Sequence, residues 1–556
     1  VAIFLFCGAL APRLFSVLGG GGFTIEGTES NDAYEKLKVL GLNQIPMEAV
    51  FHSNFLTFSD SAYQSQVEEA LAAVLDLELV SRITGPQSAA DGDWVSVDGH
   101  TAFATLWIEA DLDTAQELVP EIRATLLQPG NLEVYLTGAP AVFREMEEAS
   151  ERDIQRGEMI TLPLVLGFLL IVFGSMVAAA LPVVMGLIAV TITMALIYAI
   201  AIQVEMSIFS ANIATFLGLG VAIDYSLLMV SRFREELTSH DAAEAVTITM
   251  NTAGKAILFS ALTTILGLGG LLFFDVTILK SIGTGGIVVV VVSLLVALTL
   301  IPSLLSLLGH RVNALSLLPR RTPRIRGFWS GIATRVMQRP FLVIFAVGAF
   351  LLLLGTPFLH VRLGAPAASI LPPTYESRKG WDLLTERFGP GHTTPIIVAI
   401  ETEEGIFRSE ALARLKEFTM VLAGHPDVER VESIVDLDPQ LSLEDYIGLY
   451  QDPQAIPNPP LQAAVQEIAT DQVTLVRVFA GLDGNDEAAE ELVRYIRGLQ
   501  PQDQGLRSWT GGYTAGVMDL VTVVYGQFPR VILFIMASIY VVLLLLFRSV
   551  FLPLKA

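Results

Sequence analysis

One acidic side chain lies inside a long apolar stretch of this sequence, and its neighbours could support proton chemistry. Asp224 follows Gly218 and Gly220 and directly precedes Tyr225. It lies eight residues before Arg232, which on a helix corresponds to about 12 Å at 1.5 Å per residue. An ionisable group at such a depth in a membrane is costly unless it is paired, hydrated or protonated. Asp224 is therefore the first candidate for a functional residue.

Two interpretations of Asp224 remain open from these residues alone. Hydrocarbon favours the neutral form of a carboxyl group, so Asp224 could take up and release protons, with the Tyr225 hydroxyl donating to it and accepting from water. Gly218 and Gly220 would let a neighbouring helix approach closely and would loosen their own helix. The alternative is a protonated Asp224 that only hydrogen-bonds another helix. In both cases we expect its side chain to face the interior of a helix bundle.

A basic residue at the inner end of the next apolar stretch also has two possible roles. Lys255, which follows Thr252-Ala253-Gly254, could reach inward as a counter-charge to Asp224. It could instead extend to the membrane interface, as lysines at helix ends commonly do. Thr263 and Thr264 follow on the same stretch as polar neighbours, or simply bond the backbone of their own helix.

Other patterns that could carry chemistry are incomplete. Gly254-Lys255 is followed by Ala256 and lacks the earlier glycine of a phosphate-binding loop. The seven histidines have no metal-ligand spacing, the single cysteine, Cys7, excludes an intramolecular disulfide, and no Gly-x-Ser-x-Gly motif occurs. The net charge of −23 argues against nucleic acid as a partner. We therefore expect no enzyme activity, no cofactor and no metal, and we expect a proton gradient as the energy source.

The chain that positions Asp224 is unusually apolar. Of its 556 residues 52% are hydrophobic and 16% are charged, whereas a soluble domain carries about 25% charged residues. Crossing a bilayer takes about 20 apolar residues. We predict seven such stretches, at 159–179, 181–202, 207–230, 256–275, 282–308, 340–358 and 531–547. The shorter run Val1–Ala11 is typical of the end of another membrane helix, and we expect this sequence to be part of a longer chain.

The distribution of charge predicts the orientation. Residues 19–157 hold 24 acidic and 7 basic residues, and residues 361–527 hold 25 and 12. By contrast, residues 310–340 contain seven arginines and no acidic residue. Short loops rich in arginine and lysine stay in the cytoplasm. We therefore expect a multi-pass protein of the cytoplasmic membrane whose two large acidic domains are extracytoplasmic.

The chain also repeats itself. An offset of 374 positions places Gly138 on Gly512 and Phe173 on Phe547. Each copy consists of a helix, an external domain and a helix, which predicts a parallel repeat related by an axis along the membrane normal.

Both external domains show the order β-α-β-β-α-β, the split, ferredoxin-like arrangement. In the first we predict a strand at 49–58, a helix at 63–84, a hairpin at 93–110 around Asp98-Gly99, a helix at 114–127 and a strand at 132–136. In the second we predict strands at 395–400, 431–435, 472–480 and 506–509 and helices at 409–423 and 486–498, with an insertion rich in proline and glutamine near 438–465.

The predicted fold is thus a polytopic α-helical membrane protein with two external α+β domains and a parallel internal repeat. Its parts in chain order are the end of a first membrane helix (1–18), the first external domain (19–157), helices two to six (158–309), a basic cytoplasmic linker (310–339), helix seven (340–360), the second external domain (361–527) and helix eight (528–550). The remainder of a second helix bundle is expected beyond the sequence.

At this point the residues resemble a known family. The run Gly218–Glu236 is similar to the fourth-helix signature of the MMPL transporters, which belong to the resistance–nodulation–division superfamily. Thr252–Thr263 is similar to the fifth helix of that family, with Lys255 where an arginine is expected. The repeat and the two external domains agree, so the resemblance covers essentially the whole chain.

The resemblance implies a proton-driven exporter of lipids or other hydrophobic molecules, with the external domains forming the substrate passage. It assigns the proton relay to Asp224 and Tyr225, supported by Gly218, Gly220 and Lys255. A second Asp-Tyr pair would fall near position 598, beyond this sequence.

Three functions are compared on this basis. The first is a proton-coupled exporter whose partners are membrane lipids, a hydrophobic substrate and protons. The second is a non-transporting relative that senses lipid or assists protein secretion. The third is a membrane enzyme, which the lack of any convergent His, Cys or Ser constellation disfavours. The sequence makes no prediction of the oligomeric state.

Overall fold

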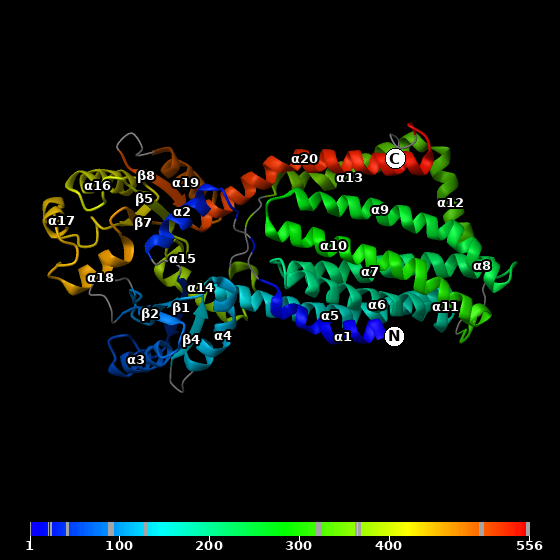
Figure 1. Cartoon of the computed structure of the whole chain (residues 1–556), viewed down its shortest axis with the longest axis horizontal. Helices are drawn as coiled ribbons and strands as arrows, with labels where there is room; N and C mark the ends of the chain where they lie inside the picture. Colours follow the sequence, from blue (N-terminus) through cyan, green and yellow to red (C-terminus); the bar gives the residue numbers. More distant parts are fainter. Residues whose placement is uncertain are drawn as a thin grey trace.

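The molecule is elongated, with long helices running side by side and two small sheets together at one end of them (Figure 1). The computed structural model describes residues 2–19, 22, 25–40, 44–86, 94–126, 132–316, 325–361, 364, 368–499 and 505–551. The helices α8 (Ala242–Thr249), α11 (Ile301–Leu308) and α12 (Ile325–Gln338) lie at the end of the bundle opposite the sheets.

Seven helical segments of the described chain are long and apolar enough to cross a membrane. They span Ala139–Phe173, Met176–Ala201, Phe209–Glu236, Ala242–Phe273, Thr277–Asn313, Pro340–Phe358 and Tyr513–Phe547. A shorter apolar helix covers Phe4–Val17. Each of the seven segments overlaps one of the seven predicted stretches, and the chain is a polytopic, mostly helical membrane protein.

The main helices of these segments are α1 (Ala2–Leu10), α5 (Ala139–Phe173), α6 (Met176–Ala201), α7 (Phe209–Glu236), α9 (Lys255–Gly269), α10 (Thr277–Leu295), α13 (Pro340–Gly355) and α20 (Tyr513–Phe547). Helix α7 packs between α6 and α10, α10 also packs on α9, and α9 contacts α20.

The first predicted stretch ends too late in the sequence. Helix α5 ends at Phe173 rather than at residue 179, because Gly174 adopts a left-handed conformation with φ 66°. The side chain of Ser175 then accepts a hydrogen bond from the backbone N–H of Ala178 and begins α6. Hydropathy is continuous across this junction, so only the backbone chemistry of two small residues separates the helices.

The first sheet follows the element order β1, α3, β2, β3, α4, β4 along the chain. The strands are β1 (Ile45–His52), β2 (Val80–Thr84), β3 (Thr101–Ile108) and β4 (Glu133–Thr137), and the helices are α3 (Ser61–Leu75) and α4 (Leu112–Leu126). All neighbouring strands are antiparallel, in the spatial order β2-β3-β1-β4. Alternate residues of β1, Met47, Ala49 and Phe51, are buried in the core that includes residues of both helices.

The second sheet follows the same order, β5, α16, β6, β7, α19, β8. Its elements are β5 (Ile396–Glu401), α16 (Ser409–Ala423), β6 (Val428–Glu432), β7 (Val473–Ala480), α19 (Glu487–Leu499) and β8 (Arg507–Gly511). The strands are again antiparallel, in the spatial order β6-β7-β5-β8. The insertion between β6 and β7 forms α17 (Leu443–Leu449) and α18 (Pro459–Ile468).

Two predictions for the first sheet were wrong in detail. The predicted helix 63–84 ends at Leu75, and residues Val80–Thr84 form β2 instead. The predicted hairpin around Asp98-Gly99 is a tight turn with a single bridge between Val95 and Ala102. Instead, β3 pairs with β1 over its whole length and with β2 over Thr105–Ile108. Pairing with a distant strand therefore outweighed the local turn.

Two helices that precede the sheets were not predicted. Helix α2 (Glu29–Leu37) precedes β1, and α14 (Glu376–Phe388) precedes α15 (Pro390–Thr393) and β5. Both are short, highly charged segments between a membrane helix and a sheet, and both bury one face, with Ala33 and Leu37 of α2 and Leu384 of α14 inside.

Candidate functional site

Helix α7 carries the candidate residues and is held by close packing on two sides. A side-chain carbon at Gly218 would lie only 2.4 Å from Cγ2 of Val289 on α10 and 3.3 Å from Cγ2 of Val190 on α6. Any larger residue would push these helices apart, so Gly218 has the role in close helix approach that the sequence predicted. Gly220 does not, because no described atom lies within 4 Å of the same position there.

The remaining side of α7 is uncovered by the described chain. Phe216, Gly220, Asp224 and Leu228 recur every four residues, which places them on one side of the helix. All four are exposed, Phe216 by 55% and Leu228 by 43%. Leu258 and Leu262 of α9 are each 37% exposed. We call the four residues of α7 the open face.

Contrary to the expectation from the sequence, Asp224 does not point into the described bundle. It is exposed on the open face, and none of the described residues forms an ion pair with it. The physical reason is that α6 and α10 pack against other sides of α7, where Gly218 meets Val190 and Val289. The carboxyl group of Asp224 lies on the side that these two helices leave uncovered. An apolar helix with a charged group on an uncovered side needs a polar partner, water or a proton there.

Tyr225 lies next to Asp224 in sequence but on a different side of α7. Its side chain is 8% exposed, and its hydroxyl interacts with the hydroxyls of Ser260 and Thr264 on α9. Thr264 also donates to the backbone carbonyl of Ser260 at 2.9 Å, and Thr263 donates to the same carbonyl at 2.8 Å. The threonines thus bond the backbone of their own helix, and Thr264 additionally meets Tyr225.

Lys255 stands at the start of α9 and is exposed. Within the part of the chain that the structure describes it makes no ion pair with Asp224, so the counter-charge role is not realised in this arrangement. Its exposure at a helix end agrees with the alternative, in which the side chain extends to the interface.

The segment just before Lys255 has a feature that sequence reasoning missed. Met250–Gly254 forms a π-helical turn between α8 and α9, and Val296–Leu300 forms another between α10 and α11. The two turns contact each other and both contact α7. Such turns are rare and occur frequently at functional sites. In the sequence, Gly254 was the residue that could have indicated this turn. In the structure it is buried and lies next to Leu298 of the second turn.

The bundle interior holds polar groups without partners. The hydroxyls of Thr193 on α6, Ser210 and Thr215 on α7 and Ser293 on α10 are buried and accept or donate no hydrogen bond among the described residues. Asn212 of α7 uses its amide nitrogen to donate to the hydroxyl of Ser150 on α5 at 3.3 Å, while its oxygen has no partner in the same described set. Buried polar groups of this kind are usually satisfied by bound water.

Helix α7 and its neighbours bring together three kinds of polar group. Among the described residues no group of three or more His, Cys, Asp or Glu side chains is placed to hold a metal ion. The three kinds of polar group are a carboxyl group at mid-helix, a neighbouring phenol whose hydroxyl interacts with hydroxyls of α9, and buried hydroxyl groups towards α6 and α10 that have no partner among the described residues.

Comparison with known proteins gives consistent matches. The model of the MMPL family matches residues 27–343. The "Mycolic acid-containing lipids exporter MmpL11" of Mycolicibacterium smegmatis is 28% identical over 567 residues, which cover 98% of this chain and 56% of that protein. The "Trehalose monomycolate exporter MmpL3" of Mycobacterium tuberculosis is 28% identical, covering 76% of this chain and 45% of that protein. The "Heme uptake protein MmpL11" of the same organism is 27% identical, covering 77% and 42%. The chain thus spans about half the length of these curated relatives.

Proposed function

This chain belongs to the MMPL family, whose members are transporters rather than enzymes, and from that premise we propose that it exports lipids or other hydrophobic molecules across the cytoplasmic membrane at the expense of the proton gradient. Two relatives are named as exporters of mycolic-acid lipids and of trehalose monomycolate, which supports a lipid as the substrate class. One relative is named as a heme uptake protein, so heme is the first other cargo to test.

The observation that carries the proton-driven mechanism is the position of Asp224. It lies near the middle of a 28-residue helix, on the open face, without an ion-pair partner in the described chain. Because an uncompensated charge is costly in hydrocarbon, the two protonation states of such a group favour different surroundings. Proton uptake and release at Asp224 would therefore favour two arrangements of the helices around it, which is what coupling to a gradient requires.

Tyr225 fits the second member of the relay. Its hydroxyl joins the polar groups of α9, so it could pass a proton between Asp224 and Ser260 or Thr264 through small rotations or a bound water. Gly218 would act only by fixing the position of α7 against α10. Gly220, with open space before it, would leave room beside Asp224 for another helix or for water.

We propose that further helices of the whole transporter cover the open face. This chain covers 56% and 45% of the length of two relatives, so these relatives are about twice as long as this chain. A second Asp-Tyr pair on the covering helices, as the family resemblance implies, would bring two carboxyl groups together and make their titration cooperative.

The orientation and the internal repeat are also part of the proposal. The arginine-rich segment 310–339 would lie in the cytoplasm, and the acidic parts, 19–157 and 361–527, would form two ferredoxin-like domains outside the cytoplasmic membrane. The repeat is supported by α5 and α20, which are both 35 residues long. Both follow a glycine at positive φ, Gly138 or Gly512, and both end at a left-handed residue, Gly174 or Arg548.

Reconstitution of the full-length protein tests this function. Purified protein in liposomes is given a proton gradient, and the movement of a fluorescent lipid and of heme between leaflets or compartments is followed. We expect lipid movement that needs the gradient and falls to the level of protein-free vesicles in Asp224→Asn. The control is Asp275→Asn, which removes an exposed carboxylate that pairs with Lys280 outside α7.

Each alternative has its own outcome in this assay. Lipid movement that continues without a gradient, or in Asp224→Asn, contradicts proton coupling through this residue. Movement of heme in place of lipid contradicts the substrate class. A folded protein that binds lipid but moves neither cargo indicates the non-transporting alternative.

A further inference from the structure

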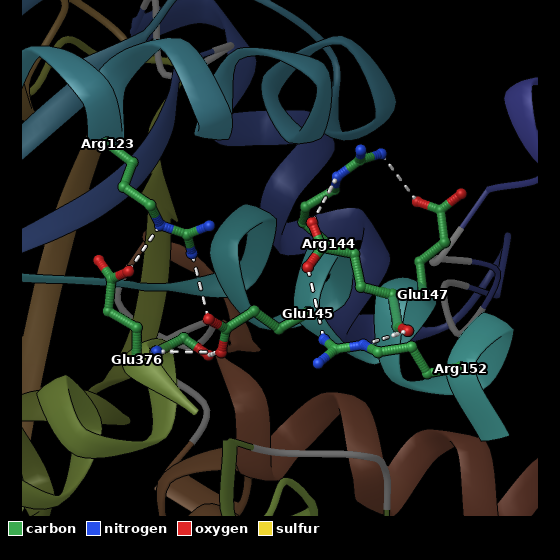
Figure 2. A network of polar contacts seen from close by, with 8 residues as sticks. Arg123, Arg144, Glu145, Glu147, Arg152 and Glu376 are labelled. Atoms are coloured by element: carbon green, nitrogen blue, oxygen red, sulfur yellow. Dashed lines mark hydrogen bonds and ion pairs between the residues drawn. The ribbon is translucent and has the colours of Figure 1, made fainter. Parts of the chain in front are cut away.

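Outside the membrane part, two networks of charged residues have matching geometry, and the first joins three helices (Figure 2). Arg123 of α4 places Nη2 at 3.1 Å from Glu145 Oε1 on α5 and Nε at 2.6 Å from Glu376 Oε2 on α14. Glu376 also accepts a hydrogen bond from the backbone N–H of Leu136 at 2.9 Å. Glu145 accepts from the backbone N–H of Ser377 at 3.0 Å and from its hydroxyl. We call Arg123, Glu145, Glu376 and Ser377 the first clamp.

The second network has the same parts on the other sheet domain. Arg497 of α19 pairs with Asp519 of α20 through both oxygens, at 2.8 and 3.0 Å, and its Nε lies 3.1 Å from Glu29 Oε2 on α2. Glu29 accepts from the backbone N–H of Thr510 at 3.0 Å, and Asp519 accepts from the backbone N–H of Ser30 at 2.9 Å. We call Arg497, Asp519, Glu29 and Ser30 the second clamp.

The two clamps correspond residue by residue. Arg123 and Arg497 are 374 positions apart, as are Glu145 and Asp519, and as are the two backbone donors Leu136 and Thr510. In each clamp a Glu-Ser pair at the start of a short helix supplies the remaining groups. The chance that two unrelated surfaces build the same four-part network is small, so the arrangement is a built feature of both domains.

In both clamps the short helix comes from the opposite half of the chain. Helix α2 follows the first apolar helix, yet it packs on β5, β8 and α20 of the second sheet domain. Helix α14 follows α13, yet it packs on β1, β4 and α5 of the first sheet domain. Each sheet domain is thus attached to the bundle twice: by its own long helix, and by a short helix that leads to a membrane helix of the other half.

The clamps are partly shielded from water, which makes them stronger than surface ion pairs. The side chain of Glu145 is 6% exposed and that of Asp519 is 12% exposed. Burial also raises the pKa of Glu376 above its ordinary value.

We propose that α2 and α14 are crossed straps, through which each half of the membrane bundle moves the sheet domain that belongs to the other half. The inference rests on the proposed function, because it assumes that the bundle halves move relative to each other when Asp224 changes its protonation state. Helices α5 and α20 are continuous over 35 residues and transmit motion along their length. A displacement of α13 relative to α5 would then pull α14 against the base of the first domain, and the first clamp would carry that pull to α4 and β4.

The chain offers sharply matched variants for testing the straps. Arg123→Gln and Arg497→Gln each break one clamp. Arg144→Gln is the control, because Arg144 lies beside the first clamp but, among the described residues, pairs only with Glu147 and Glu148 of its own helix (Figure 2). A second type of variant leaves both clamps intact and lengthens the linker that precedes α2 or α14. In these slack variants the four residues Gly-Ser-Gly-Ser are inserted after Gly27 or after Gly364. Gly27 has open space around it, and Gly364 lies between α13 and α14.

The experiment measures how the sheet domains respond to the membrane carboxyl group. Full-length protein in nanodiscs carries spin labels at Phe55→Cys and Met420→Cys, positions that are 92% and 59% exposed on the first and second domains. Every native cysteine, Cys7 included, is replaced by serine. Pulsed electron paramagnetic resonance then gives the distance between the labels, both in protein that retains Asp224 and in the Asp224→Asn variant.

We expect Asp224→Asn to shift the distance in otherwise unmodified protein and in Arg144→Gln. The shift should vanish in the clamp variants and in the slack variants, whose thermal midpoints show whether they are folded. A shift that persists in the folded slack variants overturns the straps while leaving proton coupling intact. No shift even in unmodified protein, together with lipid export that is insensitive to Asp224→Asn, shows instead that the proposed function has failed. No shift in a protein whose export does depend on Asp224 overturns the straps alone.

Discussion

The junction between the second sheet and its membrane helix depends on one glycine. Gly512 joins β8 to α20 with φ 96° and ψ 173°, a region that is open essentially only to glycine. A side-chain carbon at this position would lie 2.7 Å from the carbonyl oxygen of Pro395 and 3.2 Å from the backbone nitrogen of Ile397. Backbone strain costs roughly 1–3 kcal/mol and overpacking against a rigid strand another 1–3 kcal/mol. Gly512→Ala should therefore destabilise the second domain by about 2–6 kcal/mol.

The matched control lies one turn into the same helix. Gly516 has helical geometry and no atom within 4 Å of the added carbon, so Gly516→Ala should stabilise by about 1 kcal/mol. Unfolding in detergent by guanidinium can be followed by tryptophan fluorescence. Four of the five tryptophans lie in the sheet domains or on α14: Trp94, Trp107, Trp381 and Trp509. The midpoint should fall for Gly512→Ala and rise slightly for Gly516→Ala. Equal midpoints for the two variants would refute the reasoning.

Three further predictions concern single groups. Burial raises the pKa of Glu48 to about 7, so its folded form is stabilised by protonation, and stability should fall as pH rises from about 4.5 to about 7. Glu48→Gln should abolish that slope and raise stability at pH 8 by up to about 3 kcal/mol, and a thermal midpoint with the same pH slope in both proteins would contradict this. Arg123→Gln should cost about 3 kcal/mol by leaving Glu145 buried without its counter-charge, whereas Arg144→Gln should cost under about 1 kcal/mol, and chemical denaturation compares the two. Gly218→Ala should lower the thermal midpoint of the bundle, whereas Gly220→Ala should raise it slightly for the same reason as Gly516→Ala, and equal shifts would show that α10 is not in close contact with α7.

Much of the fold could be predicted because its signals are local. Long apolar stretches mark membrane helices whatever they pack against, and the periodic pattern of α16 gave residues 409–423, the bounds that the structure shows. β2 was missed because its burial does not alternate and only Val80 is fully buried. The junction at Gly174 was missed because hydropathy does not register a left-handed residue.

The candidate site was predictable in its residue types and unpredictable in its geometry. The sequence identified Asp224, but which side of α7 is covered depends on where α6 and α10 pack, and no pattern within one helix states that. Gly218 and Gly220 looked equivalent in sequence, yet only Gly218 is in close contact.

The clamps had a sequence signal that was overlooked. The pairs Glu29-Ser30 and Glu376-Ser377 are 347 positions apart rather than 374, so the offset that aligns the later parts of the repeat does not align them. The insertion between β6 and β7 accounts for the difference in spacing, because it lengthens the second domain after its α14 segment. An offset of 347 aligns the two pairs.

The central claim is that Asp224 exchanges a proton within the working pH range, and infrared difference spectroscopy measures this directly. Full-length protein in lipid bilayers, with its aspartate carboxyl groups isotopically labelled, is stepped between pH 8 and pH 5. The account predicts a carboxyl band that appears on acidification and is missing in Asp224→Asn but present in Asp275→Asn. A carboxyl band from Asp224 that persists unchanged across this range, or that never forms, would contradict it.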